Sequence, residues 1–137
     1  MKKFFAPQSL YLENGMALLR MVVGCFMLYH GLEVFSAEKM KVYFEWQPFR
    51  DASWLPYLGK ALEFVAGLLL TAGLLTRLAA LLMIGTLAYI TFFVGNGKVW
   101  YEDQHPFLFV LLGLVFVFTG PGNFALDNML FKKDKMN

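Results

Sequence analysis

Four ionisable side chains lie within or beside apolar stretches of this sequence, and their types suit proton exchange. His30 and Glu33 follow the apolar run MALLRMVVGCFM, Glu63 lies near the start of a second run, and His105 precedes the last one. Imidazole titrates near neutral pH and a carboxylate accepts or releases protons, so such groups can exchange protons with a bound ligand. An ionisable group near mid-membrane costs about 2.5–3.5 kcal/mol, so we expect such a residue either to pair with another polar group or to have a functional role.

The composition indicates a membrane protein. Hydrophobic residues make up 58% of the 137 residues and charged residues 16%, against roughly 45–50% and about 25% in soluble domains. A chain this short cannot bury so much apolar surface in one soluble core. The net charge is only +2 and no basic stripe is present, which argues against nucleic-acid binding. Cys25 is the only cysteine, which excludes an intrachain disulfide and a cysteine-based metal site; we predict no metal site.

Four apolar segments predict an all-α integral membrane protein, in which residues 1–137 form one domain built as a four-transmembrane-helix bundle. A spanning helix needs about 20 mostly apolar residues. The fourth segment starts at Pro106, which suits a first helical turn, and stops at Gly120–Pro121, which ends a helix. It is short for a hydrocarbon core of about 30 Å. The four predicted spans cover about 15–35, 57–75, 77–94 and 105–119.

The connections carry residues typical of a membrane surface. A long loop between the first two spans (36–56) mixes aromatic and charged residues, which suits the headgroup zone. The tail FALDNMLFKKDK places apolar residues at helical spacing before lysines, as in a short interfacial helix. Four spans put both termini on one side, with seven of the 12 Lys and Arg residues. This excess favours cytoplasmic termini.

Helical geometry predicts that several polar residues meet near the outer ends of the helices. His30 lies about five residues before the end of the first span and Glu63 about six after the start of the second, so antiparallel neighbours place them at similar depth. His105 opens the fourth segment on the same side. We therefore expect an outer-leaflet site between the first two spans. The candidate catalytic residues are His30 and Glu63, and the candidate ligand-binding residues are Arg20, His30, Glu63 and His105.

Several interpretations of these residues remain open. His30 and Glu63 can form a hydrogen-bonded pair that only locks two helices, or a site that exchanges protons with a quinone or another small apolar ligand. Two histidines on one side also permit haem ligation, but only His30 is embedded, so we favour a quinone. Arg20 lies near the cytoplasmic end, where it can extend to lipid phosphates or anchor an acidic group inside the bundle.

The sequence resembles the DoxX family over about residues 18–130. The motifs that carry the resemblance are RMVVG with His30–Gly31 after it, Glu63 within ALEFVAGLLLTAGLLTRLAALLMIG, and the closing TGPGNFALDNML with Asp127. The resemblance implies a four-helix protein of the bacterial inner membrane. The family takes its name from a subunit of a quinone-linked thiosulfate-oxidising complex. Other members are associated with redox homeostasis and with resistance to quinones and thiol stress.

The resemblance and the polar residues together predict a quinone-linked redox or redox-homeostasis subunit, accessory to a membrane oxidoreductase complex. Its expected partners are membrane lipid and other redox subunits, with homo-oligomers also possible. Two other classes of function remain open. One is a non-catalytic membrane scaffold or assembly factor. The other is a small-solute transporter, for which four short helices would need a dimer.

Overall fold

The computed structural model describes residues 11–131, and all regular secondary structure in this part of the chain is helical. The all-α prediction is therefore confirmed for these residues. The predicted topology rests partly on terminal lysines that lie outside the described residues: Lys2, Lys3, Lys132, Lys133 and Lys135.

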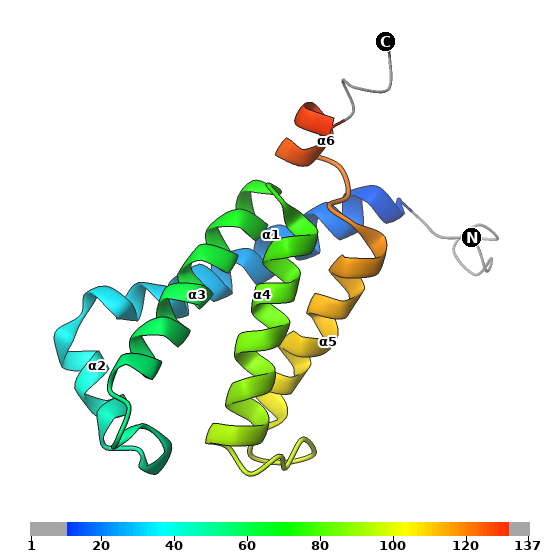
Figure 1. Cartoon of the computed structure of the whole chain (residues 1–137). Coiled ribbons are helices and arrows are strands. Elements are labelled where there is room, and N and C mark those ends of the chain that lie inside the picture. Colours follow the sequence, from blue (N-terminus) through cyan, green and yellow to red (C-terminus); the bar gives the residue numbers. More distant parts are fainter. Residues whose placement is uncertain (1–10, 132–137) are drawn as a thin grey trace.

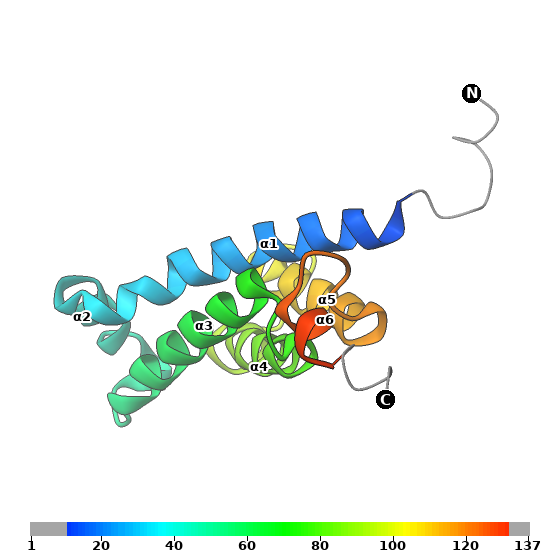
Figure 2. The same cartoon turned by 90° about the horizontal axis from the view of Figure 1, so that it is seen from above.

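Four long helices form the body of the fold (Figure 1). In Figure 2, α1 lies along one side of the bundle beside α3, and α4 packs on α3 and α5. Helices α3 and α4 meet at a tight turn and diverge away from it (Figure 1). The long helices are α1 (Leu12–Gly31), α3 (Trp54–Ala72), α4 (Thr76–Tyr89) and α5 (Gln104–Thr119).

Short helical turns extend two of the long helices. The 3-10 turn η1 (Leu32–Phe35) continues α1, and the π-helical turn η3 (Ile90–Val94) continues α4. With these extensions, three helical segments are long and apolar enough to cross a membrane: Leu12–Phe35, Trp54–Ala72 and Thr76–Val94. The fourth predicted span corresponds to α5, which has 16 residues.

The predicted long loop between α1 and α3 is partly helical. It contains helix α2 (Ala37–Phe44) and the 3-10 turn η2 (Gln47–Phe49). Ser36 caps α2 by accepting a hydrogen bond from the backbone N–H of Lys39, which satisfies one of the free donors at a helix N-terminus. The short tail helix is present as α6 (Leu126–Phe131).

Glycines allow α1 and α3 to approach each other closely. A Cβ atom on Gly31 would overlap the backbone of Phe64, and one on Gly67 would overlap the backbone of Leu28. Small residues at such positions are typical of helix pairs in membranes, where packing rather than water exclusion drives association. Gly31 and Gly67 therefore let the two backbones pack against each other.

Arg20 closes the end of the bundle opposite η1. The side chain is fully buried, and its guanidinium donates hydrogen bonds to the carbonyl oxygens of Leu70, Thr71, Pro121 and Phe124. The first two carbonyls belong to the last turn of α3, which leaves its final C=O groups unpaired and carries partial negative charge. Arg20 therefore neither extends to the surface nor pairs with an acid; it joins α1 to backbone oxygens of two other segments.

Asp127 completes the same end of the fold. Its carboxylate accepts hydrogen bonds from the backbone N–H groups of Leu75 (2.6 Å) and Thr76 (2.9 Å), at the start of α4. The backbone N–H of Asp127 donates to the carbonyl of Gly73 at 2.9 Å. Gly73 and Leu75 both have positive φ angles. The tight α3–α4 turn is thus held by α6, while Arg20 holds the segment that leads into α6.

Replacing Arg20 should destabilise the fold more than replacing an exposed arginine. Arg20→Met removes four hydrogen bonds to buried or partly buried carbonyls, which we expect to cost about 3 kcal/mol or more. The loss should appear as a lower melting temperature by circular dichroism in detergent. Arg77→Met is the matched control, because Arg77 is exposed on α4. Equal melting temperatures for the two variants would contradict the role given to Arg20.

A methyl group at Gly67 should force α1 and α3 apart. We expect Gly67→Ala to lower the free energy of unfolding by about 1–3 kcal/mol, as overpacked cores do. Gly15→Ala is the control, since a Cβ there meets nothing within 4 Å and alanine favours a helix by about 0.5–1 kcal/mol. Thermal unfolding of both variants in the same detergent tests this, and an unchanged Gly67→Ala protein would refute it.

Candidate functional site

A buried lysine joins two carboxylates at the end of the bundle opposite Arg20. The ammonium of Lys60 lies 2.9 Å from a carboxylate oxygen of Glu63 and 3.1 Å from one of Glu33. The three side chains are 12%, 4% and 17% exposed, respectively. Charges this buried are costly unless they are paired and hydrogen-bonded. We call Glu33, Lys60 and Glu63 the charge cluster.

Local backbone geometry brings the charge cluster together. Lys60 and Glu63 are three residues apart on α3, so they share one face of the helix. Glu33 comes from η1, whose 3-10 turn follows directly on α1. Tyr43 of α2 also reaches the cluster: its hydroxyl donates a hydrogen bond to Glu33 at 2.6 Å, and its ring lies 5.0 Å from the Lys60 ammonium. Helix α2 therefore covers the cluster with an aromatic side chain.

Tyr43 acts as a hydrogen-bond donor in this arrangement. Burial, together with the hydrogen bond to Glu33, raises the pKa of Tyr43 above its ordinary value near 10. The phenol consequently keeps its proton at neutral pH and donates a hydrogen bond to the carboxylate of Glu33.

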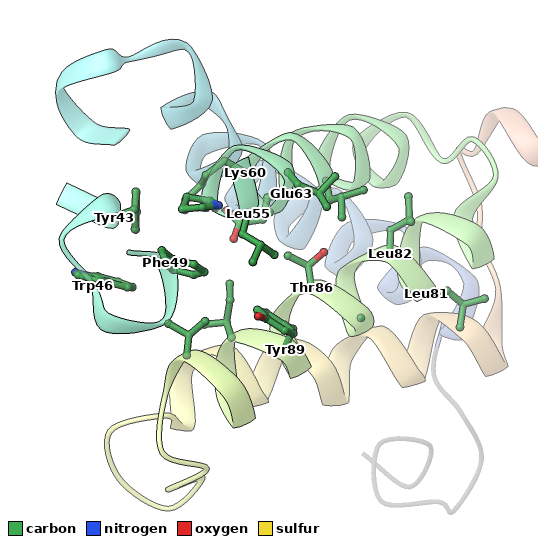
Figure 3. Close-up of a pocket in the computed structure, with 17 residues that line it drawn as sticks. Tyr43, Trp46, Phe49, Leu55, Lys60, Glu63, Leu81, Leu82, Thr86 and Tyr89 are labelled. Carbon is green, nitrogen blue, oxygen red and sulfur yellow. Dashed lines mark hydrogen bonds and ion pairs between the residues drawn. The ribbon is translucent and has the colours of Figure 1, made fainter. Parts of the chain in front are cut away.

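A cavity of about 450 Å³ lies between α3 and α4, beside the charge cluster. Figure 3 shows Leu55 and Phe49 on one side of this space and Thr86 and Tyr89 on the other. Apolar side chains make up most of the wall, and Leu58 and Leu81 at its rim are largely exposed. The polar groups on the wall come from Tyr43, Lys60, Glu63, Thr86 and Tyr89. An apolar cavity with a few polar groups is typical of small-molecule sites.

Thr86 supplies a buried hydroxyl without a partner in this cavity. The residue is 8% exposed, and its Oγ1 atom forms no hydrogen bond with any described residue. Threonines of membrane helices commonly donate to the carbonyl four residues earlier, as Thr71 and Thr91 do at 2.8 Å. Thr76 Oγ1, at the other end of α4, is also unpaired. A buried polar atom left free in a cavity wall is available to a ligand.

A second cavity, of about 160 Å³, lies on the other side of the charge cluster. His30 of α1 and His105 of α5 both line it, and their rings are 6.3 Å apart in an edge-to-face arrangement. Lys60 and Glu63 line it as well. Three of the four candidate residues thus meet around one small space: His30, Glu63 and His105.

Two sequence-based interpretations need correction. Glu63 forms its ion pair with Lys60, and no hydrogen bond within residues 11–131 joins it to His30, so these two residues are not a locking pair. Arg20 lies ten residues before His30 on α1, about 15 Å away by helical rise. Its guanidinium is occupied by backbone carbonyls. We therefore leave Arg20 out of the candidate ligand site.

Sequence reasoning missed Lys60, Tyr43 and Thr86. Lys60 entered the sequence analysis only as one of the positive charges used to predict the topology. Its spacing of three residues from Glu63 could have predicted an ion pair on one face of a helix. Tyr43 lay in a segment predicted as loop, and its place beside Glu33 depends on α2. Nothing in the sequence distinguishes Thr86 from the threonines that bond to their own helix.

Removing the lysine of the charge cluster should destabilise the protein strongly. Lys60→Met leaves the buried carboxylate of Glu63 and the partly buried one of Glu33 without their shared cation. Removing one partner of a buried ion pair costs about 3–5 kcal/mol. The double variant Lys60→Met/Glu63→Leu should recover much of that loss, because it removes a buried charge as well. Melting temperatures in detergent measure both effects.

The exposed pair Lys98–Glu102, with an N–O distance of 3.4 Å, provides the control for this comparison. Lys98→Met should change stability by no more than about 1 kcal/mol. A loss in Lys60→Met as small as that in Lys98→Met would show that the charge cluster contributes little to the fold.

Comparison with known proteins agrees with the membrane character of the fold. The DoxX family profile matches residues 15–96. A Haemophilus influenzae relative named "Uncharacterized protein" is 34% identical over 130 residues, covering 90% of this chain and 96% of its own. A Bacillus subtilis relative named "Putative oxidoreductase CatD" is 30% identical over 130 residues, covering 90% and 92%. No solved structure matches the chain. The protein is a membrane protein that belongs to the DoxX family.

Proposed function

We propose that this protein is a membrane redox subunit that binds a quinone, or an apolar redox molecule of similar shape, in the cavity between α3 and α4. The observation that carries the proposal is the combination of apolar walls, the charge cluster and the free hydroxyl of Thr86 in about 450 Å³. This moves the ligand from the expected position between the first two spans to the other face of α3.

The cavity suits a ligand that arrives through lipid. Leu58 and Leu81 lie at its rim and are 45% and 55% exposed, as expected of side chains that face lipid. An apolar tail can extend through this opening while a polar head group lies deeper. The name of the Bacillus subtilis relative, an oxidoreductase, agrees with a redox ligand.

The polar groups of the cavity match the two oxygen atoms of a quinone head group. Thr86 and Lys60 can donate hydrogen bonds to carbonyl oxygens, and Glu63 can give or take a proton. Reduction of a quinone to a quinol consumes two electrons and two protons. In this proposal, a partner redox subunit supplies the electrons and the charge cluster exchanges the protons.

The proposed arrangement in the membrane has four spans. Helix α5, at 16 residues, is about 24 Å long, and a locally thinner bilayer accommodates such a length. Both termini then lie on one side, which we place in the cytoplasm of a bacterial inner membrane. The charge cluster and both cavities belong to the outer half, and α6 lies at the inner surface.

Quinone binding tests this function directly, and Trp46 in the cavity wall provides the signal. A short-tailed ubiquinone should quench tryptophan fluorescence of the purified protein in a saturable way. Thr86→Val should weaken binding about three- to tenfold, the value of one hydrogen bond. Gly85→Leu should weaken it about tenfold or more, because its side chain would enter the cavity and its Cβ meets nothing within 4 Å.

Thr91→Val is the matched control for Thr86→Val, since the Thr91 hydroxyl bonds to its own helix and does not line the cavity. It should leave the dissociation constant within about twofold of wild type. No saturable quenching by the wild-type protein would overturn the proposal and favour the scaffold function. Equal affinities for Thr86→Val, Gly85→Leu and wild type would place the ligand elsewhere.

A further inference from the structure

The charge cluster separates two cavities of different character. Lys60, Glu63 and Ile90 line both the 450 Å³ cavity and the 160 Å³ cavity. The larger one holds the ligand in the proposed function. The smaller one has an imidazole from α1 and another from α5 on its wall, together with Lys60 and Glu63. A carboxylate that faces both spaces can take a proton from one and release it into the other.

The smaller cavity is suited to water. A water molecule needs roughly 10–15 Å³ of accessible volume and two to four polar partners, and 160 Å³ therefore has room for several. Polar atoms are available from His30, Lys60, Glu63 and His105. Water molecules between these groups would complete a chain of hydrogen bonds across the cavity.

The two histidines lead from the protein surface to this cavity. His105 is exposed at the start of α5, whereas His30 is half-buried on α1. Both imidazoles line the cavity, where their ring nitrogens can bind water. As a residue type, histidine is the side chain most often used to carry protons under physiological conditions.

We propose that the smaller cavity is a proton path, in which His105 and His30 pass protons between the water outside the bundle and Glu63. In the direction of quinone reduction, the His30 imidazolium transfers a proton to the Glu63 carboxylate and becomes neutral. His105, through cavity water, then returns a proton to His30. Glu63 releases its proton to the reduced ligand in the larger cavity. This proposal rests on the proposed function for the identity of the final acceptor.

The groups around His30 are consistent with this role. Lys60 and Glu63 face the cavity from α3, and His105 faces it from α5. Glu33 of η1 contacts Lys60, and the ring of Tyr29 lies 5.7 Å from that of His30. From α4 and η3, the lining residues are Leu87 and Ile90, which are apolar. Among the described residues that line this cavity, Lys60 and Glu63 are therefore the only lysine and the only acid.

Proton uptake during reduction of a bound quinone tests the path. The full-length protein in nanodiscs, loaded with short-tailed ubiquinone, is reduced by a flash-excited ruthenium dye with a sacrificial electron donor, and a pH-indicator dye reports proton uptake. His30→Asn and His105→Asn should each slow uptake about tenfold or more, with quinone affinity within about twofold of wild type. Added imidazole should restore the rate, which a structural defect would not allow.

Phe109→Leu is the matched control, because Phe109 lines the same cavity without carrying a proton. It should take up protons at the wild-type rate. Wild-type rates in both histidine variants, or slow rates that imidazole does not restore, would overturn the proton path.

A second measurement tests the path without any quinone. The chain has two histidines, so hydrogen–deuterium exchange at the imidazole C2 carbon, followed by mass spectrometry, reports water access to each. Both C2 positions should exchange. Phe109→Trp narrows the cavity, so it should lower the exchange rate at His30 about threefold or more and leave the rate at His105 unchanged. A His30 ring that does not exchange would overturn the path. Exchange at His30 without quinone binding would reject the proposed function and retain the path.

Discussion

The end of the bundle opposite Arg20 depends on one ammonium group shared between two carboxylates. Lys60 contacts Glu63 on its own helix and Glu33 on the extension of α1. The cluster contains two acids and one base, so its charges do not cancel within it. In a low-dielectric bundle such a surplus makes the cluster sensitive to any proton or polar ligand that comes near. Lys60 and Glu63 line both cavities, so the proposed ligand and the proposed proton path would meet at this cluster.

At the opposite end of the bundle, two side chains pair with free backbone groups at the ends of helices. Backbone carbonyls at a helix end have no water to bind within the hydrocarbon, and each must find a donor inside the protein. Arg20 provides several donors from one side chain, and Asp127 accepts from the free N–H groups at the start of α4. This closed end holds α3 and α4 together at their turn. Their divergence beyond the turn opens the larger cavity (Figure 1).

Sequence patterns predicted the long helices and part of the site, for physical reasons. Apolar runs of about 20 residues have few alternatives to a helix in a membrane. The depth of each residue along its helix was sufficient to predict that His30, Glu63 and His105 lie near one another. The partners of Arg20 were not predictable, because backbone carbonyls carry no residue-type signal. Lys60 was missed because its effect depends on Glu33, which the η1 turn brings to it.

We propose that an apolar redox ligand occupies the space between α3 and α4, and photo-crosslinking measures its position most directly. An azido-quinone bound to the protein in nanodiscs, illuminated and mapped by mass spectrometry, should label residues 55–63 of α3 and 81–90 of α4, and excess unlabelled quinone should suppress this labelling. Labelling confined to the lipid-facing surfaces of α1 or α5, or labelling that unlabelled quinone does not suppress, would contradict the account.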